Sequence, residues 1–486
     1  MSEPHVTDAF TALNLPPEQI DNLTALGYTR MTPVQAQALP IALQGGDLIV
    51  QARTGSGKTA AFGIALLNRI NQRDFGTQTL ILCPTRELAT QVATEIRRLA
   101  RYLPNLKVVV LCGGQAFGPQ VGSLEHGAHI VIGTPGRIRD HIEKQTLNLS
   151  RVSTLVLDEA DRMLDMGFSE DIELIIDQTP ATRQTLLFSA TFPHDIESLS
   201  AKYQKGARRV TIEEGHGAAS IAQHYYSCGA TEAGDSRYVA VLRLLLHFKP
   251  ESCLVFCNTK QATRDTARFL VHAGLSAMPL HGDMEQRERD QVLIQFRHQS
   301  CQILVATDVA ARGLDIEQLP MVINCELPRD LEVYTHRIGR TGRAGNTGMS
   351  LSVFFENERF RVDALRARQE QLSDSDIQSI AMVPQERGKP APPAWQTLSI
   401  AGGRKNKIRP GDVLGALTAG GVIPGTAIGR IDILDHASYV AIDTALVKEA
   451  LEQLAGRPIK GQKFKVRRCS MHVDAGTEET GSPWKR

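Results

Sequence analysis

Long hydrophobic segments are absent from this chain of 486 residues. No apolar run approaches the roughly 18 residues that span a bilayer, and the first ten residues, MSEPHVTDAF, contain acids and no apolar core. The sequence therefore indicates neither export nor a membrane partner, and we expect a cytoplasmic protein. Its 42% hydrophobic and 22% charged residues are typical of a globular chain. The length predicts about three domains.

Paired cysteines are also missing. The eight cysteines lie at positions 83, 112, 228, 253, 257, 301, 325 and 469, without the C-x-x-C spacing of zinc sites. Several stand within apolar runs such as TLILCP and SCLVFCN. We therefore expect reduced thiols in hydrophobic cores.

Net charge is nearly absent too, at +1, and this total by itself indicates no partner. The charges are unevenly distributed, however. Residues 394–470 contain 12 Lys and Arg against 6 Asp and Glu, a net charge of +6 that leaves about −5 for the remainder. A basic module thus follows a mildly acidic body.

Short runs rich in Val, Ile and Leu alternate with helical patterns along most of the chain. Continuous apolar runs of this kind predict parallel strands that are buried on both faces. We expect strands at 47–52, 79–84, 107–112, 129–134, 154–159 and 184–189, and a second set at 252–257, 302–307, 321–326 and 349–354. Two doubly wound parallel-sheet α/β domains are the simplest interpretation.

The domain boundaries follow from breaks in these patterns. Residues 205–220 lose apolar periodicity and gain glycine, as a linker does, and residues 383–394 contain four prolines, which favour an extended tether. We predict a first domain at 1–212, a linker at 213–220, a second domain at 221–382, a Pro-rich linker at 383–393, a basic domain at 394–470 and a tail at 471–486.

The stretch VQARTGSGKTA, residues 50–60, is typical of a phosphate-binding loop between a strand and a helix. Thr54, Gly55, Ser56 and Gly57 would present backbone amides to phosphate oxygens, Lys58 would reach the β- and γ-phosphates, and Thr59 would offer a hydroxyl to Mg²⁺. Ala52 departs from the general G-x-x-x-x-G-K-[ST] pattern. Alone, the loop is also compatible with a kinase, a transporter ATPase, a GTPase or a motor.

A second motif, the acidic VLDEAD at residues 156–161, stands at the carboxyl end of a predicted strand, where parallel sheets bind ligands. Asp158 could hold Mg²⁺ through water, and Glu159 could orient and deprotonate the water that attacks the γ-phosphate. Without the phosphate loop, these acids would be ordinary residues of a helix N-terminus.

Further motifs occur in a fixed order. They are GYTRMTPVQ (27–35), PTRELA (84–89), Gly113–Gly114, TPGR (134–137), SAT (189–191), ATDVAARGLD (306–315) and HRIGRTGR (336–343). With ARTGSGKT and DEAD, they make residues 10 to about 355 resemble a DEAD-box RNA helicase, whose phosphate loop begins with alanine. The resemblance implies two tandem RecA-like domains and an RNA-dependent ATPase that uses ATP and Mg²⁺.

The resemblance also implies roles for single residues. Tyr28 would stack on adenine, Gln35 would recognise its edge, and Asp315 would contact the ribose. Arg340 and Arg343 would act as arginine fingers on the γ-phosphate once the two domains close. Ser189, Thr191, Asp161 and His336 would couple the nucleotide state to closure.

RNA contacts are implied in the same way, through hydroxyls, small residues and backbone amides that suit a sugar-phosphate track. In the first domain they are Pro84, Thr85, Arg86, Gly114, Thr134, Pro135, Gly136 and Arg137; in the second they are Thr259, Arg289, Thr307, Asp308 and Gly313. Each taken alone is an ordinary turn residue.

The basic segment predicts strand 397–401, helix 410–419, strands 428–433 and 437–442, helix 444–455 and strand 463–468, an order that resembles an RNA-recognition motif. Ala437 replaces one stacking aromatic, Tyr439 remains, and the first predicted strand offers none. Recognition would then use the basic residues Arg404, Lys405, Lys407, Arg409, Lys463, Lys465, Arg467 and Arg468.

This RRM-like α+β domain on a helicase core resembles the DbpA subgroup. The resemblance implies a hairpin of large-subunit (23S) ribosomal RNA as the partner, a role in ribosome assembly, and a monomer. Parting five base-pair steps at about 1.4 kcal/mol each costs about 7 kcal/mol, which a local clamp can supply, so we expect local strand separation. A general RNA-remodelling ATPase with a non-specific basic tether, a non-catalytic RNA clamp and a DNA helicase remain alternatives.

Overall fold

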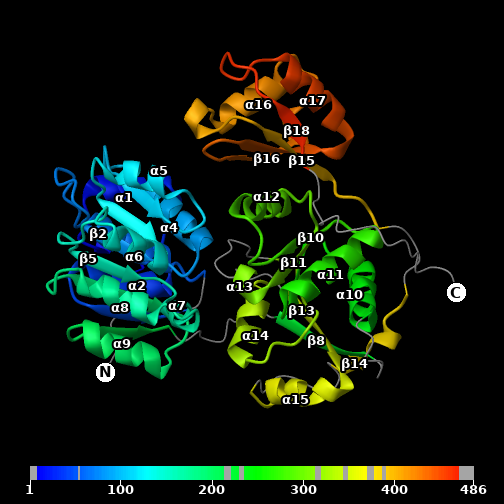
Figure 1. The fold of residues 1–486 in the computed structure, drawn as a ribbon, viewed down its shortest axis with the longest axis horizontal. Coiled ribbons are helices and arrows are strands. Elements are labelled where there is room, and N and C mark those ends of the chain that lie inside the picture. Colours follow the sequence, from blue (N-terminus) through cyan, green and yellow to red (C-terminus); the bar gives the residue numbers. More distant parts are fainter. Residues whose placement is uncertain are drawn as a thin grey trace. The chain divides into compact units, whose positions relative to one another are not determined.

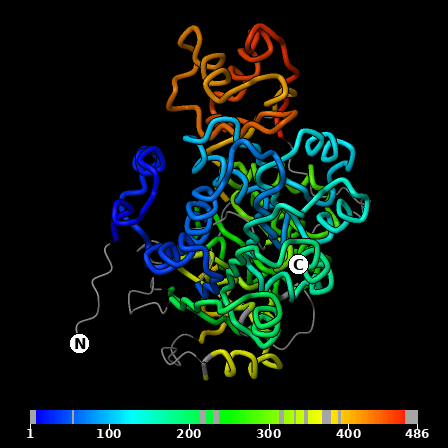
Figure 2. Tube along the Cα trace, turned by 90° about the vertical axis from the view of Figure 1, so that its left-hand side faces the viewer, coloured from blue at the N-terminus to red at the C-terminus, as the bar shows by residue number. Residues whose placement is uncertain are grey.

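The computed structural model describes residues 8–52, 55–212, 221–228, 235–311, 319–342, 348–368, 377–385 and 390–469 (Figure 1). The chain divides into two compact units. The first contains the N-terminal α/β domain. The second contains another α/β domain and the small C-terminal domain, which forms a body of its own in orange and red in Figure 2.

The first domain is built on a parallel sheet in the order β3-β4-β2-β5-β6-β1-β7. Its strands are β1 (Leu48–Gln51), β2 (Thr79–Leu82), β3 (Val108–Leu111), β4 (Ile130–Gly133), β5 (Thr154–Leu157), β6 (Gln184–Ser189) and β7 (Arg208–Thr211). The central strands are buried along their whole length, as continuous apolar runs require.

Helices cover both faces of this sheet. They are α1 (Pro17–Ala25), α2 (Pro33–Leu43), α3 (Lys58–Leu67), α4 (Arg86–Leu99), α5 (Phe117–Leu124), α6 (Pro135–Glu143), α7 (Ala160–Asp165), α8 (Ser169–Asp177) and α9 (His194–Tyr203). One hydrophobic core joins α1 to α4 to the sheet, and a second joins α6 to α9 to the opposite face. The doubly wound arrangement places every strand-to-helix loop at one carboxyl edge.

The second domain repeats this plan in the order β10-β11-β9-β12-β13-β8-β14. Its strands are β8 (Ile221–Cys228), β9 (Cys253–Cys257), β10 (Ala277–Leu280), β11 (Ile303–Thr307), β12 (Met321–Asn324), β13 (Gly348–Phe355) and β14 (Ile377–Ser379). Its helices are α10 (Asp235–Phe248), α11 (Lys260–His272), α12 (Gln286–Arg297), α13 (Asp308–Ala311), α14 (Leu331–Ile338) and α15 (Arg359–Arg368). The two sheets confirm the prediction of tandem RecA-like domains.

The C-terminal domain is a four-stranded antiparallel sheet in the order β16-β17-β15-β18, covered on one face by two helices. Its elements are β15 (Trp395–Ile400), α16 (Pro410–Thr418), β16 (Ile428–Ile433), β17 (Ser438–Asp443), α17 (Val447–Gly456) and β18 (Val466–Arg468). This is the predicted β-α-β-β-α-β order.

The structure corrects the sequence prediction of the strands. Strand β7, which was not predicted, occupies residues 208–211 within the predicted first domain, although apolar periodicity is lost there. The predicted linker at residues 213–220 lies outside the described part of the chain. Strands β8, β10 and β14 were not predicted. Strand β15 begins at Trp395 rather than at residue 397, so the first strand does carry an aromatic residue.

Seven of the eight cysteines are buried, and all eight are free thiols. This agrees with the expectation of reduced core cysteines. No helix in the described ranges has the length and hydrophobicity needed to cross a membrane.

Candidate nucleotide and RNA sites

The phosphate loop connects β1 to α3. Gly55 and Gly57 have φ angles of 82° and 95°, a backbone conformation that residues with side chains rarely adopt. A Cβ on Gly57 would also lie 2.6 Å from Nε2 of Gln35, so the loop needs glycine here. Lys58 is buried, and its Nζ donates to the carbonyl of Ala52 at 2.8 Å. Thr54 lies outside the described residues.

Gln35, which we predicted to recognise adenine, forms hydrogen bonds at this loop. Gln35 Oε1 accepts from the Thr32 amide at 2.9 Å, and Gln35 Nε2 donates to the Gly57 carbonyl at 3.2 Å. Thr32 Oγ1 donates to the Ser56 carbonyl at 2.8 Å. Thr32 and Gln35 form a capping box at the start of α2. We did not single out Thr32, although the T-x-x-Q spacing carries the signal for such a box.

Tyr28 lies beside the same helix start and is half-buried. Its hydroxyl donates to Glu95 Oε1 at 2.5 Å, and its ring meets Phe10 edge-on at a centroid distance of 6.2 Å. Burial and the Glu95 carboxylate raise the pKa of Tyr28 well above its ordinary value. The phenol is therefore fixed in place, which leaves its ring as the part that a base could contact.

The acidic motif follows β5, which is separated from the phosphate-loop strand β1 by β6 alone. Asp158 is buried, and its Oδ1 has no hydrogen-bond partner. Burial raises the pKa of Asp158 to about 7, partly offset by the charge of Lys58. A bound cation would satisfy this oxygen and favour the ionised carboxyl.

The donor set therefore fits Mg²⁺ held by Asp158 and Thr59. Among the residues that the structure describes, no group of three or more His, Cys, Asp or Glu side chains could hold a metal. Mg²⁺ usually takes one or two protein oxygens and completes its shell with phosphates and water, so two side chains are a sufficient donor set.

Glu159 takes a left-handed backbone conformation, with φ of 53°, at the N-cap of α7. Its Oε2 accepts from Arg162 Nη1 at 2.8 Å, and both side chains are buried. Sequence reasoning missed Arg162. The signal was its position three residues after Glu159, a spacing at which an acid and an arginine can pair.

Asp161 accepts hydrogen bonds from the SAT segment, residues 189–191. Its Oδ2 accepts from the Ala190 amide at 3.1 Å, the Thr191 amide at 2.9 Å and Thr191 Oγ1 at 3.0 Å. Ser189 Oγ donates to the Thr191 carbonyl at 2.5 Å. Burial acts to raise the pKa of Asp161, but these bonds and the charge of Lys58 outweigh it and lower that pKa. Three predicted coupling residues thus lie together, while His336 belongs to α14 of the second unit.

The candidate RNA residues of the first domain follow the neighbouring strands β2, β3 and β4. Thr85 caps α4 by accepting from the Leu88 amide at 3.3 Å, and Thr134 precedes α6, with Pro135 at its first position. Gly114 has φ of 69°, and a Cβ there would fall on the guanidinium of Arg86. The two predicted residues Arg86 and Gly114 are therefore in contact.

The candidate residues of the second domain show the same arrangement. Thr259 caps α11 by accepting from the Ala262 amide at 3.1 Å, Thr307 ends β11, and Asp308 begins α13. Arg289 Nη1 donates to the His281 carbonyl at 3.4 Å, and Arg340 is buried just beyond α14. Gly313, Asp315 and Arg343 fall outside the described residues.

Arg337, which we did not single out, connects the strand ends of this domain. Its guanidinium donates to both oxygens of Asp308 at 2.6 and 2.8 Å, to Asn258 Oδ1 at 2.7 Å and to Asn324 Oδ1 at 3.2 Å. It also donates to the Glu326 carbonyl at 2.7 Å. The side chain is 1% exposed, so the first arginine of HRIGRTGR organises the domain interior.

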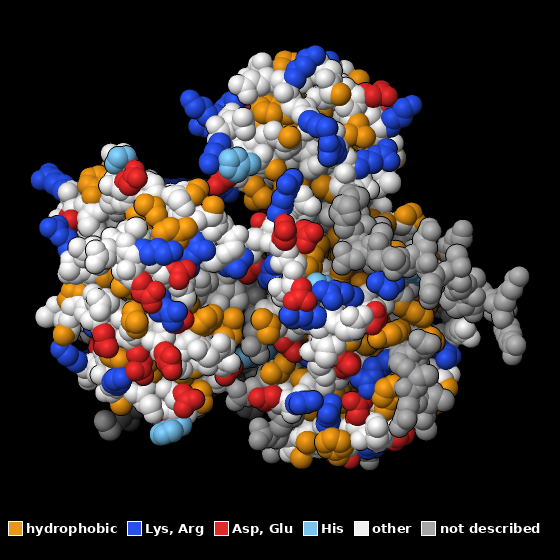
Figure 3. All heavy atoms as spheres, viewed as in Figure 1, with side chains coloured by type: hydrophobic (Ala, Val, Ile, Leu, Met, Phe, Trp, Pro, Cys, Tyr) orange, Lys and Arg blue, Asp and Glu red, His pale blue; other side chains and the backbone are white. Residues whose placement is uncertain are grey.

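The predicted basic residues of the C-terminal domain are all exposed, and Figure 3 shows Lys and Arg side chains distributed over this domain. Two basic segments, 404–409 and 460–465, lie side by side. Lys460 Nζ donates to the Lys407 carbonyl at 2.7 Å, and the Ala401 amide donates to the Lys465 carbonyl at 2.9 Å. We call these adjoining segments the basic loops.

The open face of the C-terminal sheet packs on the end of α12. Tyr439 is 3% exposed, and its hydroxyl accepts from Gln291 Nε2 at 3.4 Å. Thr397 Oγ1 lies 2.6 Å from Ser300 Oγ, and Asp432 lies 3.0 Å from His298 Nε2. The remaining predicted aromatic is therefore covered by the protein itself. A Cβ on Gly429 would lie 3.1 Å from the ring of Trp395.

Comparison with known proteins gives consistent matches along the chain. Residues 32–199 match the DEAD/DEAH box helicase model, residues 236–345 the helicase conserved C-terminal domain, and residues 397–468 the DbpA RNA binding domain. The ATP-dependent RNA helicase DbpA of Escherichia coli K12 is 49% identical over 464 residues, which cover 94% of this chain and 99% of that relative.

A second relative, the ATP-dependent RNA helicase DbpA of Bacillus subtilis 168, is 38% identical over 92% of this chain and 96% of its own length. Among solved structures, Dbp5 of S. cerevisiae bound to RNA and ADP BeF3 is similar with a TM-score of 0.68 and 28% identity. That match covers 76% of this chain and 95% of the yeast chain.

Proposed function

Because this chain belongs to the DEAD-box ATP-dependent RNA helicases of the DbpA type, we propose that its C-terminal domain directs it to a large-subunit (23S) ribosomal RNA hairpin. The core is an RNA-dependent ATPase and helicase. The proposed setting is assembly of the large ribosomal subunit, with local separation of short duplexes.

One observation carries this proposal. The exposed basic loops of the C-terminal domain converge, whereas its open sheet face is buried against α12 and offers no free surface around Tyr439. Charge-assisted contacts to phosphates, arranged by two loops on one edge, suit a folded RNA hairpin better than stacking of single-stranded bases.

We assign the catalytic steps to residues at the carboxyl edges of the two sheets. Lys58 and the amides of residues 55–57 would bind the phosphates, and Asp158 with Thr59 would hold Mg²⁺, which neutralises developing charge on the phosphates. Glu159 would accept a proton from the attacking water. Arg340 and Arg343 would stabilise the γ-phosphate in the transition state.

Crosslinking tests the proposed RNA target. The full chain is crosslinked to RNA in cells, and the bound fragments are sequenced. We expect reads concentrated on one hairpin of the large-subunit ribosomal RNA. Reads spread over unrelated RNAs in proportion to their abundance would instead support the alternative of a non-specific basic tether.

Replacing Glu159 tests the assignment of the catalytic base. Glu159→Gln keeps the shape of the side chain but removes the proton acceptor, so turnover should fall by about 10²–10⁴-fold. Binding of ATP and RNA should survive, which would trap the complex before hydrolysis. Near-normal turnover in a steady-state assay with saturating RNA would remove Glu159 from this role.

A further inference from the structure

The arginine after the acidic motif forms a buried ion pair inside the candidate active site. Arg162 Nη1 donates to Glu159 Oε2 at 2.8 Å, and the two side chains are 4% and 6% exposed. Breaking a buried pair by removing one partner is costly, because the other charge stays buried. We therefore expect the ion pair at this position to have a function beyond packing.

We propose that Arg162 is a positioning residue for ATP hydrolysis, which holds one carboxylate oxygen of Glu159 so that the other oxygen faces the attacking water. The inference rests on the proposed role of Glu159 as the base. A free carboxylate side chain rotates, and a charge-assisted hydrogen bond to one oxygen removes that freedom.

The local backbone supports this assignment. Glu159 has φ of 53°, so its side chain leaves the chain at a direction different from that of the helix that follows. Arg162 lies one turn later on α7, and its amide donates to Asp161 Oδ1 at 3.0 Å. The other oxygen of Asp161 accepts a hydrogen bond from the Thr191 amide of the SAT segment. One short helix therefore connects Glu159, its arginine and the coupling residues.

Substitution of Arg162 tests the proposal in the full chain. Arg162→Met should lower kcat for RNA-stimulated hydrolysis by about 10–100-fold, the usual effect of a misplaced reacting group. KM for ATP and the affinity for a non-hydrolysable ATP analogue should stay unchanged, because Gln35 and the phosphate loop are intact. Arg162→Lys should recover part of kcat. Arg151→Met, which removes an exposed pair with Asp74 in the same domain, is the matched control.

A double-mutant cycle decides whether Arg162 acts through Glu159. In the Glu159→Gln background, adding Arg162→Met should cause no further loss of residual turnover. An unchanged kcat in Arg162→Met, or an equal loss in both backgrounds, would overturn the positioning role. Absence of RNA-stimulated hydrolysis in the unsubstituted chain would instead overturn the proposed function.

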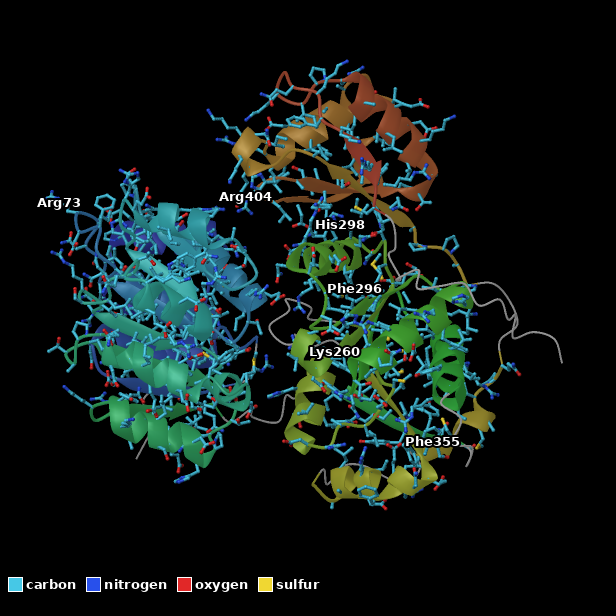
Figure 4. The ribbon with its side chains drawn as sticks, viewed as in Figure 1. Arg73, Lys260, Phe296, His298, Phe355 and Arg404 are labelled. Atoms are coloured by element: carbon cyan, nitrogen blue, oxygen red, sulfur yellow. The ribbon has the colours of Figure 1, made fainter. Side chains whose placement is uncertain are left out.

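A separate observation concerns the contact between α12 and the C-terminal domain. His298, labelled in Figure 4, lies at the C-terminus of α12 with no exposed side-chain surface. Its Nε2 lies 3.0 Å from Asp432 Oδ2 and its Nδ1 lies 3.2 Å from Thr397 Oγ1. Thr397 Oγ1 lies 2.6 Å from Ser300 Oγ, which in turn donates to the Gln295 carbonyl at 3.1 Å.

From these contacts we infer that His298 is the polar anchor that holds the C-terminal domain on α12. Asp432 comes from β16, and Arg430 and Arg297 lie near its carboxylate. Burial acts to raise the pKa of Asp432, but the His298 bond and both arginines outweigh it and lower that pKa. Removing the imidazole would leave the buried side of Asp432 and Thr397 without this partner, so docking should weaken.

Fluorescence energy transfer between labels on α11 and α17 of the full chain tests this contact. His298→Ala should lower the docked fraction, whereas His272→Ala, which replaces an exposed histidine of the same domain, should leave it unchanged. An equal docked fraction in the unsubstituted chain and in His298→Ala would overturn the inference.

Discussion

At the scale of single residues, the candidate active site is an arrangement of buried charges. The motifs in the sequence placed Lys58, Asp158 and Glu159 at one edge of the sheet, because loops after parallel strands meet there. They did not identify the partners of these side chains. Arg337, for instance, reaches Asn258, Asp308 and Asn324 from three different strand ends, and such contacts depend on tertiary packing.

The ionisation of Asp158 makes a pH prediction. Its pKa of about 7 is above the ordinary value, so between about pH 4 and pH 7 the folded domain holds a proton that the unfolded chain releases. Stability in the absence of nucleotide should therefore fall as pH rises through this range. Binding of Mg²⁺ with ATP requires the ionised carboxyl, so affinity should be about tenfold weaker at pH 6 than at pH 8.

Calorimetry in two buffers of different ionisation enthalpy checks this expectation. The full chain should release close to one proton at pH 6 when Mg²⁺ and ATP bind, after subtraction of the proton release seen with Asp158→Asn. Identical proton release by both proteins would show that Asp158 is already ionised before the ligand binds.

At the scale of elements, the central strands were predictable, whereas β7, β8, β10 and β14, at or near the sheet edges, were not. Strands β2, β4, β5 and β6 are buried throughout and appear as continuous apolar runs. Strand β7 has one buried residue in four, and β8 mixes polar and apolar residues. Strand β10 contains Pro279 at the sheet edge, where the missing donor is tolerated. Hydrophobic pattern therefore loses its signal where one side of a strand meets solvent.

The packing of α3 on α4 gives a prediction at this scale. A Cβ on Gly63 would lie 2.8 Å from Leu99 Cδ1 and 2.9 Å from Ile96 Cδ1. Gly63→Leu should therefore lower the free energy of unfolding of the first domain by about 1–3 kcal/mol through overpacking. Amide exchange protection in α3 measures this. Gly122→Leu, where a Cβ on α5 meets nothing within 4 Å, is the control and should not be destabilised.

At the scale of the whole molecule, the C-terminal domain shows what sequence could and could not predict. Its element order and exposed basic residues were predicted from patterning alone. Burial of Tyr439 under α12 was not, because it depends on Gln291, His298 and Ser300 of another domain. This interface also makes deletion of the domain a poor test, since deletion would expose the buried His298.

The central claim, that the exposed basic residues of the C-terminal domain select the RNA, is tested most directly by charge reversal in the full chain. The measurement is the RNA concentration for half-maximal ATPase activity, with a large-subunit ribosomal RNA hairpin and with unrelated RNA of equal length. The unsubstituted chain should need less of the hairpin. Reversal of Lys463, Lys465, Arg467 and Arg468 to glutamate should abolish this preference, and the salt slope should fall by about 0.7–0.9 for each phosphate that is no longer neutralised. Reversal of Lys448 and Arg457, exposed on and just beyond α17, should retain it. An unchanged hairpin preference in the fourfold variant would contradict the account.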